Sequence, residues 1–562
     1  MDNIVQRVKD EIKDMVIKSI KKAVDSGLMS IEEIPEIEIE EPKEKQYGDF
    51  AINTAMIMSK QAKMAPRKIA EIIVNNINKE DSLIEKIDVA GPGFINFYIK
   101  TIYLEETLKL VYERNKDYGR VNIGKGKKVQ VEFVSANPTG PMHMGNARGG
   151  AIGDALASIL DYAGYDVTRE FYINDVGNQI EKFGYSLETR YLELLGVKSE
   201  ILEGGYHGED IIDRAKEFLE LYGDRYKDYP SEDRRKALVE YSLKKNIEKI
   251  KEDLNAYGIE YDVWFSEKIL HDNGEVDNVI KELKEKGYTY EKDGAIWFKE
   301  TLFGADKDDV LVRANGYPTY LASDIAYHKN KFITRGYDWV IDIWGADHHG
   351  HVAPMKGAMK ALGINPDRLD VLLMQLVRLI KGGEVVKMSK RTGRMVTLRD
   401  LIEEVGKDAA KFFFNMRSAD SAVDFDMDLA KEQSNENPVF YVQYAHARIC
   451  SIIRQLEEEG VKIRDIENAD LSLLKEETEK DLIKKLAYLP EEVTIAAKTM
   501  APHRITRYIL DVASLFHSFY NSCRVKGVDE NLMKARLVLI VATRTVIKNV
   551  LDMLKITAPE KM

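Results

Sequence analysis

Residues 129–150 read VQVEFVSANPTGPMHMGNARGG, and the interpretation of the whole chain begins with this stretch. It starts as a strand, because Val129, Val131 and Phe133 alternate with polar residues. Two prolines then break the ladder, and the glycine-rich run from Ala147 onward is typical of a helix. A strand that turns into a helix start presents backbone N–H groups to an anion. The small residues that we expect to let a phosphate approach the backbone are Gly145, Ala147, Gly149 and Gly150.

This pattern predicts a nucleotide site on the first strand of a parallel α/β domain. An ordinary strand–turn–helix with a buried histidine, His143, explains the shape of the stretch about as well. The choice between the two therefore depends on what the rest of the chain contains.

A second stretch, KMSKRTG at 387–393, follows an apolar strand, VLLMQLVRLI, and a Gly382-Gly383 turn. Lys387 and Lys390 lie three residues apart on this glycine-flanked loop. Two such lysines suit a clamp on phosphate oxygens, although a solvated basic loop explains this stretch when it is taken alone.

The two stretches, in this order, resemble the HIGH and KMSKS signatures of class I aminoacyl-tRNA synthetases. Asn146 stands where the first signature usually ends in histidine. Asparagine donates to a phosphate oxygen but carries no charge. Further segments resemble the arginyl-tRNA synthetases in particular: YGDFAINTAM, GPGFINFYI, NPVFYVQYAHARI, DAAKFFFNMRSADSAVDFDMDLA and the closing LKITAPEKM.

Composition indicates a cytoplasmic enzyme rather than a membrane or secreted protein. The chain has 562 residues, with 44% hydrophobic and 31% charged. No apolar run reaches the roughly 18 residues of a membrane span, and the charged N-terminus has no signal-peptide core. Cys450 and Cys523 are too few for a disulfide framework.

The sequence predicts three domains. Residues 1–115 read as an α+β module, residues 118–427 as a Rossmann-like parallel-sheet catalytic domain, and residues 437–562 as an all-helical domain. A charged helical insertion interrupts the catalytic domain at about 181–261. The resemblance implies that the first domain contacts tRNA and the last binds its anticodon arm. A simple packing appendage is the alternative for the first.

The C-terminal end is basic although the net charge of the chain is −12. Residues 500–562 hold 10 Lys or Arg against 5 Asp or Glu, which fits a nucleic-acid partner or chance clustering. Arg504 and Arg507, three apart on one expected helix, are candidate tRNA phosphate contacts.

Tyr320 and Asp324 lie one turn apart on an expected helix and so share a face that suits a cationic ligand. A surface pair is the alternative. The resemblance implies that Glu132, Asn137, Tyr320 and Asp324 bind arginine, with Asp324 and Tyr320 at the guanidinium and the other two near the α-ammonium group.

The segment GADHHGH at 345–351 ends an apolar strand and contains three histidines and an aspartate. A metal site is one interpretation of this segment. A ligand-binding loop at the carboxyl end of a parallel strand is favoured. The resemblance supports an ATP-contacting loop, and we expect no metal held by protein side chains.

The implied reaction activates L-arginine with ATP to arginyl-adenylate and transfers the arginyl group to tRNA(Arg). The resemblance assigns catalysis to His143, Lys387 and Lys390, with Mg²⁺ bound through the leaving diphosphate. We expect a monomer. The residues implied in ATP binding are Ala136, Asn137, Pro138, Thr139, Gly140, Pro141, Met142, His143, Met144, Gly145, Asn146, Asp347, His348, Met388 and Ser389.

Three other functions remain open at this point. A different class I synthetase, such as a cysteinyl or glutaminyl enzyme, shares both signatures. A nucleotidyltransferase shares the nucleotide fold but does not need a long helical C-terminal domain. A non-catalytic tRNA-binding relative is disfavoured by the intact His143, Lys387 and Lys390.

Overall fold

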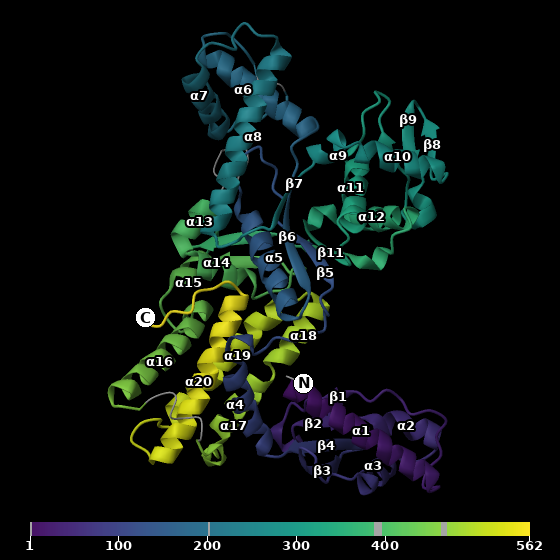
Figure 1. Cartoon of the computed structure of the whole chain (residues 1–562), viewed down its shortest axis with the longest axis vertical. Coiled ribbons are helices and arrows are strands. Elements are labelled where there is room, and N and C mark those ends of the chain that lie inside the picture. Colours follow the sequence, from purple (N-terminus) through teal and green to yellow (C-terminus); the bar gives the residue numbers. More distant parts are fainter. Residues whose placement is uncertain (1–2, 201–202, 387–395, 462–468) are drawn as a thin grey trace.

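The computed structural model of the chain describes residues 3–200, 203–386, 396–461 and 469–562. The molecule is elongated, with a parallel sheet near its middle, a helical insertion at one end and the N-terminal domain at the other (Figure 1). The helical C-terminal domain lies between the sheet and the N-terminal domain.

The N-terminal domain packs helices on one small antiparallel sheet in the order β1-β2-β4-β3. Its long first helix buries an apolar stripe that includes Val8, Ile12 and Val16, as the helical spacing of these residues predicts. Its elements are α1 (Ile4–Asp25), β1 (Ile39–Glu40), β2 (Phe50–Ile52), α2 (Thr54–Ala62), α3 (Pro66–Asn76), β3 (Ile84–Ala90) and β4 (Phe94–Ile99).

The catalytic domain is built on a five-stranded parallel sheet in the order β12-β11-β5-β6-β7. The predicted Rossmann-like fold is therefore confirmed, with the strand of the opening stretch at its centre. Because chain order reverses on either side of β5, the carboxyl edge beside β5 is where such sheets bind ligands. The strands are β5 (Lys128–Glu132), β6 (Asp166–Ile173), β7 (Val263–Ser266), β11 (Trp339–Gly345) and β12 (Leu369–Met374).

Helices cover this sheet and extend from it. Helix α5 lies directly on the central strands, and α6 to α8 form the insertion at the far end of the molecule (Figure 1). The helices up to β11 are α4 (Ile102–Arg114), α5 (Met144–Tyr162), α6 (Asn178–Leu194), α7 (Glu209–Tyr222), α8 (Ser231–Ala256), α9 (Lys268–Asp272), α10 (Glu275–Glu285) and α11 (Tyr320–Lys329), which continues as the π-turn η4 (Asn330–Thr334). Strands β8 (Thr289–Lys292), β9 (Ala295–Phe298) and β10 (Asp309–Val312) form a side lobe with α12 (His349–Ala361).

The expected single strand VLLMQLVRLI is wrong. It divides into β12 and β13 (Val377–Lys381), which belong to different sheets. The chain turns at Gln375, whose N–H donates to Ala419 O at 2.9 Å and whose carbonyl accepts from Arg148 Nη1 at 2.6 Å. Strand β13 then pairs with β14 (Glu384–Val385) and β15 (Val423–Asp426). Helices α13 (Leu398–Val405), α14 (Lys407–Phe414) and α15 (Met427–Lys431) surround this second sheet.

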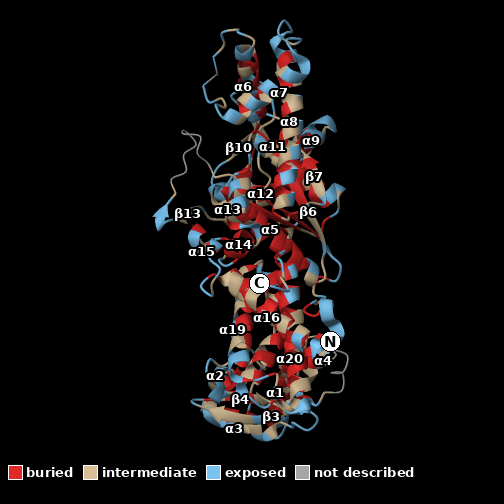
Figure 2. Cartoon of the chain, turned by 90° about the vertical axis from the view of Figure 1, so that its left-hand side faces the viewer, coloured by how far each residue is buried: buried red, intermediate tan, exposed pale blue. Residues whose placement is uncertain are grey.

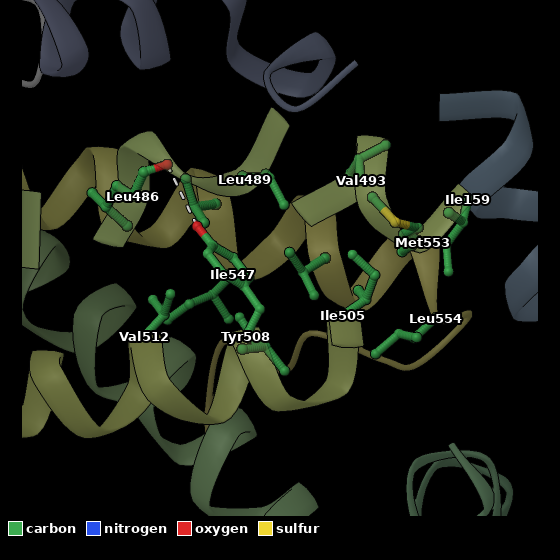
Figure 3. Close-up of a cluster of buried hydrophobic side chains, with 14 of the residues drawn as sticks. Ile159, Leu486, Leu489, Val493, Ile505, Tyr508, Val512, Ile547, Met553 and Leu554 are labelled. Atoms are coloured by element: carbon green, nitrogen blue, oxygen red, sulfur yellow. Dashed lines mark hydrogen bonds between the residues drawn. The ribbon is translucent and has the colours of Figure 1, made fainter. Parts of the chain in front are cut away.

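The C-terminal domain is all helical, as the sequence predicts. It consists of α16 (Pro438–Glu458), α17 (Glu477–Ala487), α18 (Leu489–Thr499), α19 (His503–Ser522) and α20 (Glu530–Met553). Buried residues run without interruption from the sheet into this bundle (Figure 2). In the close-up, Ile159 of α5 lies beside Val493 and Met553 of the bundle (Figure 3).

Within the described ranges, the structure contains no helix long and apolar enough to cross a membrane.

Candidate functional site

The turn after β5 is fixed by a capping box at the start of α5. Gly145 N–H donates to His143 Nδ1 at 3.1 Å, and His143 N–H donates to Asn146 Oδ1 at 3.0 Å. A side chain on Gly145 would meet the His143 ring at 2.9 Å, so this glycine permits the ring's position. Because Nδ1 accepts a hydrogen bond, a neutral His143 carries its proton on Nε2. The unusual Asn146 thus has a structural task as the helix-capping acceptor.

The expectation that this helix start offers its backbone N–H groups to an anion is wrong. Met144 N–H donates to Val396 O at 3.2 Å, and Asn146 N–H donates to His143 O at 2.9 Å. Together with Gly145, the first three donors of α5 are therefore already bonded within the protein. Any phosphate contact here has to come mainly from side chains and from the helix dipole.

The two glycines in the second turn of α5 serve packing rather than phosphate approach, which also corrects an expectation. A side chain on Gly150 would meet Ile259 at 2.7 Å, and one on Gly149 would contact Met374. Both glycines are buried. Gly150 lets α5 lie close to Ile259, which precedes β7, whereas Gly149 is in ordinary contact with Met374, and only Gly145 of this group lies at the turn itself.

The predicted catalytic lysines Lys387 and Lys390, with Met388 and Ser389, lie outside the described residues. The described segment before them is bonded to β13, and the one after them is bonded to the turn. On one side, Val386 N–H donates to Leu379 O at 2.8 Å and continues the β13–β14 pairing. On the other, Leu398 N–H donates to Met142 O at 2.9 Å, and Thr397 forms a β-bridge with His143. The chain around the KMSKS-like stretch is thus hydrogen bonded to the HIGH-like stretch.

Two further contacts hold the turn. Asn246 Nδ2 on the insertion helix α8 donates to Pro138 O at 2.8 Å. Arg148 on α5 is fully buried and donates to Gln375 O, Ser418 O and Ser421 O at 2.6–2.9 Å. Burial lowers the pKa of Arg148 to about 10, although the charge of Asp420 opposes this shift. Within the turn, Pro138, Thr139, Met142 and Met144 are buried, Asn137, Pro141 and His143 are exposed, and Ala136, Gly140, Gly145 and Asn146 are half-buried.

Three acidic side chains, those of Glu132, Glu267 and Asp324, lie at the carboxyl edge of the sheet beside this turn, and we call this cluster the acidic pocket. Asp324 belongs to α11, and burial raises the pKa of its carboxyl to about 7. The charges of His328 and Lys331 oppose the shift, whereas those of Glu267 and Glu132 add to it. An ionised carboxylate with a pKa this high gains strongly from a cationic ligand.

Glu267 belongs to this pocket and was missed by the sequence interpretation. It follows β7 and is 2% exposed. Burial raises its pKa, while Ser323, Tyr172 and His271 oppose that rise. Only its position at a carboxyl strand end signalled a role, and β7 itself was hidden behind the long insertion.

Glu132, predicted as an arginine contact, is 7% exposed and already has partners. Its Oε1 accepts from Ser135 Oγ at 2.9 Å and its Oε2 from Lys331 Nζ at 2.7 Å. Glu132 and Asp324 are electrostatic neighbours, so the fold brings these two predicted residues together.

The other two predicted arginine contacts lie at the exposed rim. Tyr320 opens α11 with 40% of its surface exposed, and its hydroxyl would lie 3.4 Å from a side chain placed on Gly177. It therefore packs on the loop after β6, one turn before Asp324. Asn137 is exposed in the turn after β5.

Asp347 and His348 follow β11 at the same edge of the sheet, because β11 pairs in parallel with β5. Their side chains are 83% and 57% exposed, and the His348 ring lies 5.8 Å from the ring of His351. Among the described residues, no group of three or more His, Cys, Asp or Glu side chains is arranged to hold a metal ion.

The two candidate tRNA contacts in the C-terminal domain differ in their surroundings. Arg504 and Arg507 both lie on α19, but Arg504 Nη2 pairs with Glu492 at 2.9 Å, whereas Arg507 is exposed. A hollow of about 610 Å³ lies between α16 and α19. Phe440, Tyr444 and His517 line it, together with the Arg448 guanidinium, which lies 4.7 Å from the Tyr444 ring.

Comparison with known families divides the chain in three. Residues 8–99 match the arginyl tRNA synthetase N terminal domain, residues 108–424 the class I (R) tRNA synthetase catalytic domain, and residues 442–562 the DALR anticodon binding domain. The parallel sheet, the two linked signature stretches and these matches define a class I aminoacyl-tRNA synthetase.

Relatives that match over the whole chain identify the family within this class. The chain is 76% identical over 562 residues to the arginine–tRNA ligase of Caldanaerobacter subterraneus subsp. tengcongensis, and 58% identical over 564 residues to that of Acetivibrio thermocellus, covering all of both chains in each comparison. The chain therefore belongs to the arginyl-tRNA synthetase family. The arginyl-tRNA synthetase of Thermus thermophilus has the same fold, with a TM-score of 0.75 at 21% identity and coverage of 98% of this chain and 100% of that one.

Proposed function

We propose that the acidic pocket and the neighbouring turn perform the reaction of this family. The enzyme activates L-arginine with ATP to arginyl-adenylate, transfers the arginyl group to tRNA(Arg), and releases AMP and diphosphate. The observation that carries the residue assignment is the juxtaposition of Asp324 and Glu267 with the HIGH-like turn. One edge of one sheet thereby offers a cation site and an anion site side by side.

Arginine fits the pocket by charge and by geometry. Its guanidinium is planar with five donors, so it needs acceptors rather than a single opposite charge. Asp324 and Glu267 supply carboxylates, and the Tyr320 hydroxyl supplies a further acceptor at the rim. Glu132 and Asn137 lie toward the turn and are assigned to the α-ammonium end or its surroundings. This direction leaves the arginine carboxylate facing the ATP α-phosphorus.

The first step needs positioning and positive charge more than covalent help. The arginine carboxylate attacks the α-phosphorus and diphosphate departs with the electrons of the broken bond. His143 donates from Nε2 to a phosphate oxygen, and Lys387 and Lys390 stabilise the departing diphosphate. Asp347, His348 and the residues of the turn surround the nucleotide. No side-chain nucleophile is required.

Mg²⁺ enters as the complex with ATP. A magnesium ion in such sites is held largely by substrate phosphates and keeps several waters.

Each of the three domains has its own role in this proposal. Residues 118–427 carry the chemistry, residues 1–115 contact tRNA, and residues 437–562 bind the anticodon arm of a tRNA that the monomer engages in the cytoplasm. The aromatic hollow on α16 and α19 suits an unstacked nucleobase, because Tyr444 and His517 offer ring faces and Arg448 a cation.

Asp324→Asn tests the arginine assignment. Leaving a desolvated cation without its partner costs about 3–5 kcal/mol, or several hundredfold and more in affinity. We expect the KM for arginine to rise by that order while the KM for ATP changes little, both measured by arginylation of tRNA.

The matched control is Asp370→Asn. Asp370 accepts from Trp339 Nε1 at 2.8 Å and lies near the amino end of β12, at the opposite edge of the sheet. This variant should leave both KM values unchanged. Equal effects of Asp324→Asn on arginine and ATP would move the guanidinium site away from Asp324.

A further inference from the structure

A buried network of ionisable side chains lies beneath the acidic pocket. Lys331 Nζ donates to Glu132 Oε2 and to Asp342 Oδ1, each at 2.7 Å. His328 Nε2 lies 2.7 Å from Asp342 Oδ2. The side chains of Lys331 and Asp342 are wholly buried, and that of His328 is 4% exposed. A lysine without contact to water is rare unless its charge is required where it lies.

The hydrogen-bond partners of His328 lie on both sides of its ring. Nδ1 lies 2.7 Å from the backbone carbonyl of Asp324, and a carbonyl only accepts. Nε2 faces Asp342, which also receives the Lys331 ammonium and therefore accepts as a carboxylate. Both ring nitrogens of His328 therefore face oxygen acceptors.

Lys331 and Asp342 stabilise each other's charged forms in this network. Burial opposes the ionisation of Asp342, but the charge of Lys331 outweighs it and holds the pKa of this carboxyl below its usual range. Burial also favours a neutral Lys331, but Asp342 and Glu132 outweigh it and raise the pKa of the ammonium. Lys331 thus lies between the carboxylates of Asp342 and Glu132.

We propose that Lys331 is a positioning residue for arginine binding, because it orients the Glu132 carboxylate under the ammonium end of the substrate. Two bonds fix that carboxylate, one from Lys331 and one from Ser135, and only the first brings a charge. Lys331 is covered by the protein and does not touch the substrate itself. The inference rests on the proposed function of the pocket.

Other titratable side chains lie around this cluster. They are Glu170 and Tyr172 from β6, Tyr261 and Glu267 from either side of β7, and Asp324 and Tyr327 from α11. Glu170 already accepts from Arg335 and Tyr327. Lys331 therefore supplies the one cation within hydrogen-bond distance of Glu132 among the described residues.

Lys331→Met removes this charge at nearly constant length. Without Lys331 the Glu132 carboxylate keeps only the bond from Ser135, so we expect the KM for arginine to rise at least tenfold at pH 7, with the KM for ATP within twofold of the unsubstituted enzyme. A lysine that only supports the fold would lower the melting temperature without this split between the two KM values.

Lys329→Met is the matched control. Lys329 lies two residues earlier in the chain, and its Nζ pairs with Glu282 at 2.6 Å on the outer side of α11. It should leave the KM for arginine at pH 7 unchanged.

A double-mutant cycle isolates the pathway through Glu132 and does not depend on the stability of the single variant. Glu132→Gln/Lys331→Met removes both charges of the pair, which proteins tolerate better than the loss of one. If Lys331 acts on arginine through Glu132, the double variant and Glu132→Gln should have the same KM for arginine within twofold. A double variant tenfold worse than Glu132→Gln would overturn the inference.

The outcomes separate this inference from the proposed function. If the unsubstituted enzyme charges total tRNA with another amino acid in preference to arginine, the proposed function fails. If arginine is preferred but folded Lys331→Met keeps its KM for arginine within twofold at pH 7, the pocket stands and the role of Lys331 is refuted.

Discussion

At the scale of single residues, the unusual feature of the site is Asp324. A carboxylate is ordinarily half-protonated near pH 4, and burial moves the pKa of this one to about 7. This carboxyl is therefore about half protonated at neutral pH. If Asp324 binds the guanidinium as proposed, arginine binding is tied to pH within the physiological range.

This coupling predicts a pH profile. Arginine binds the ionised form of Asp324, whose population rises from about a tenth at pH 6 to about nine tenths at pH 8 for a pKa of about 7. We expect kcat/KM for arginine to increase about tenfold over that range, measured at saturating ATP and tRNA. Asp324→Asn should flatten the profile. A flat profile in the unsubstituted enzyme would show that Asp324 is ionised throughout.

The lysine loop gives a second prediction at this scale. If Lys390 stabilises the departing diphosphate, Lys390→Ala should lower the rate of arginine activation by about 10²–10³. Lys381→Ala, which removes an exposed lysine of β13 paired with Glu404, serves as the control and should retain full activity. A Lys390→Ala enzyme within twofold of the unsubstituted rate would refute the assignment.

At the scale of elements, helix α5 determines how the site is assembled. In its first turn, Met144 N–H donates to Val396 O in the segment that follows the lysine loop. In its second turn, Arg148 donates to Gln375 O and Ser421 O in the chain beside β13 and β15. The helix thereby connects the turn after β5 to the segment that follows the second signature stretch and to the chain beside β13 and β15. The small residues that resemble a phosphate cradle in the sequence are mostly the surface on which α5 meets the sheet.

Asn146→Ala tests the first of these connections. It leaves the His143 N–H without its acceptor and should cost about 0.5–2 kcal/mol of helix stability, with a fall in activation rate because the His143 ring is less well placed. Asp529→Ala is the control, since Asp529 caps α20 in the C-terminal bundle. It should lose similar stability without a kinetic effect. A normal rate in Asn146→Ala would show that the cap does not position His143.

At the scale of the whole molecule, the three domains share one apolar core. Tyr118, at the start of the catalytic domain, donates from its hydroxyl to Leu486 O at 2.9 Å, and Asn549 donates back to Tyr118 O at 3.0 Å. Ile159 of the nucleotide-binding helix packs into the same bundle (Figure 3). The anticodon-binding domain is therefore a structural support of the catalytic domain as well as a neighbour.

Deletion of residues 437–562 should accordingly destabilise the remaining chain. It would expose the face of α5 that carries Ile159 and leave Tyr118 without both partners. We expect a lower melting temperature and binding of a hydrophobic dye, measured against the full chain. A truncated chain that melts as cooperatively and at the same temperature as the full chain would show that the domains fold independently.

RNA binding supplies a second prediction for the whole molecule. Removing one phosphate contact should reduce the salt slope of tRNA binding by about one. We expect this for Arg507→Ala. The change should be smaller for Arg504→Ala, because Arg504 is already paired with Glu492. Unchanged slopes in both variants would place the RNA face elsewhere, for example at the hollow lined by Tyr444 and His517.

The sequence alone determined the fold class and the family, because both depend on local signals. Strand alternation before His143, the glycine turns and the helical C-terminal pattern are written in neighbouring residues, and the two signature stretches are specific even when considered without a fold. Asp324 could also be found this way, since Tyr320 lies one turn before it.

The tertiary structure decided what depends on residues distant in the sequence. The fold brings Lys331 to Glu132 from 199 positions away along the chain, and Glu132 and Glu267 to Asp324 from 192 and 57 positions away, and no local pattern records such an approach. The first N–H group of α5 cannot bind a phosphate while it donates to Val396 O, and Arg504 is paired with Glu492 rather than free for RNA. The charge state of Asp324 is likewise a property of burial, which exists only once the chain has folded.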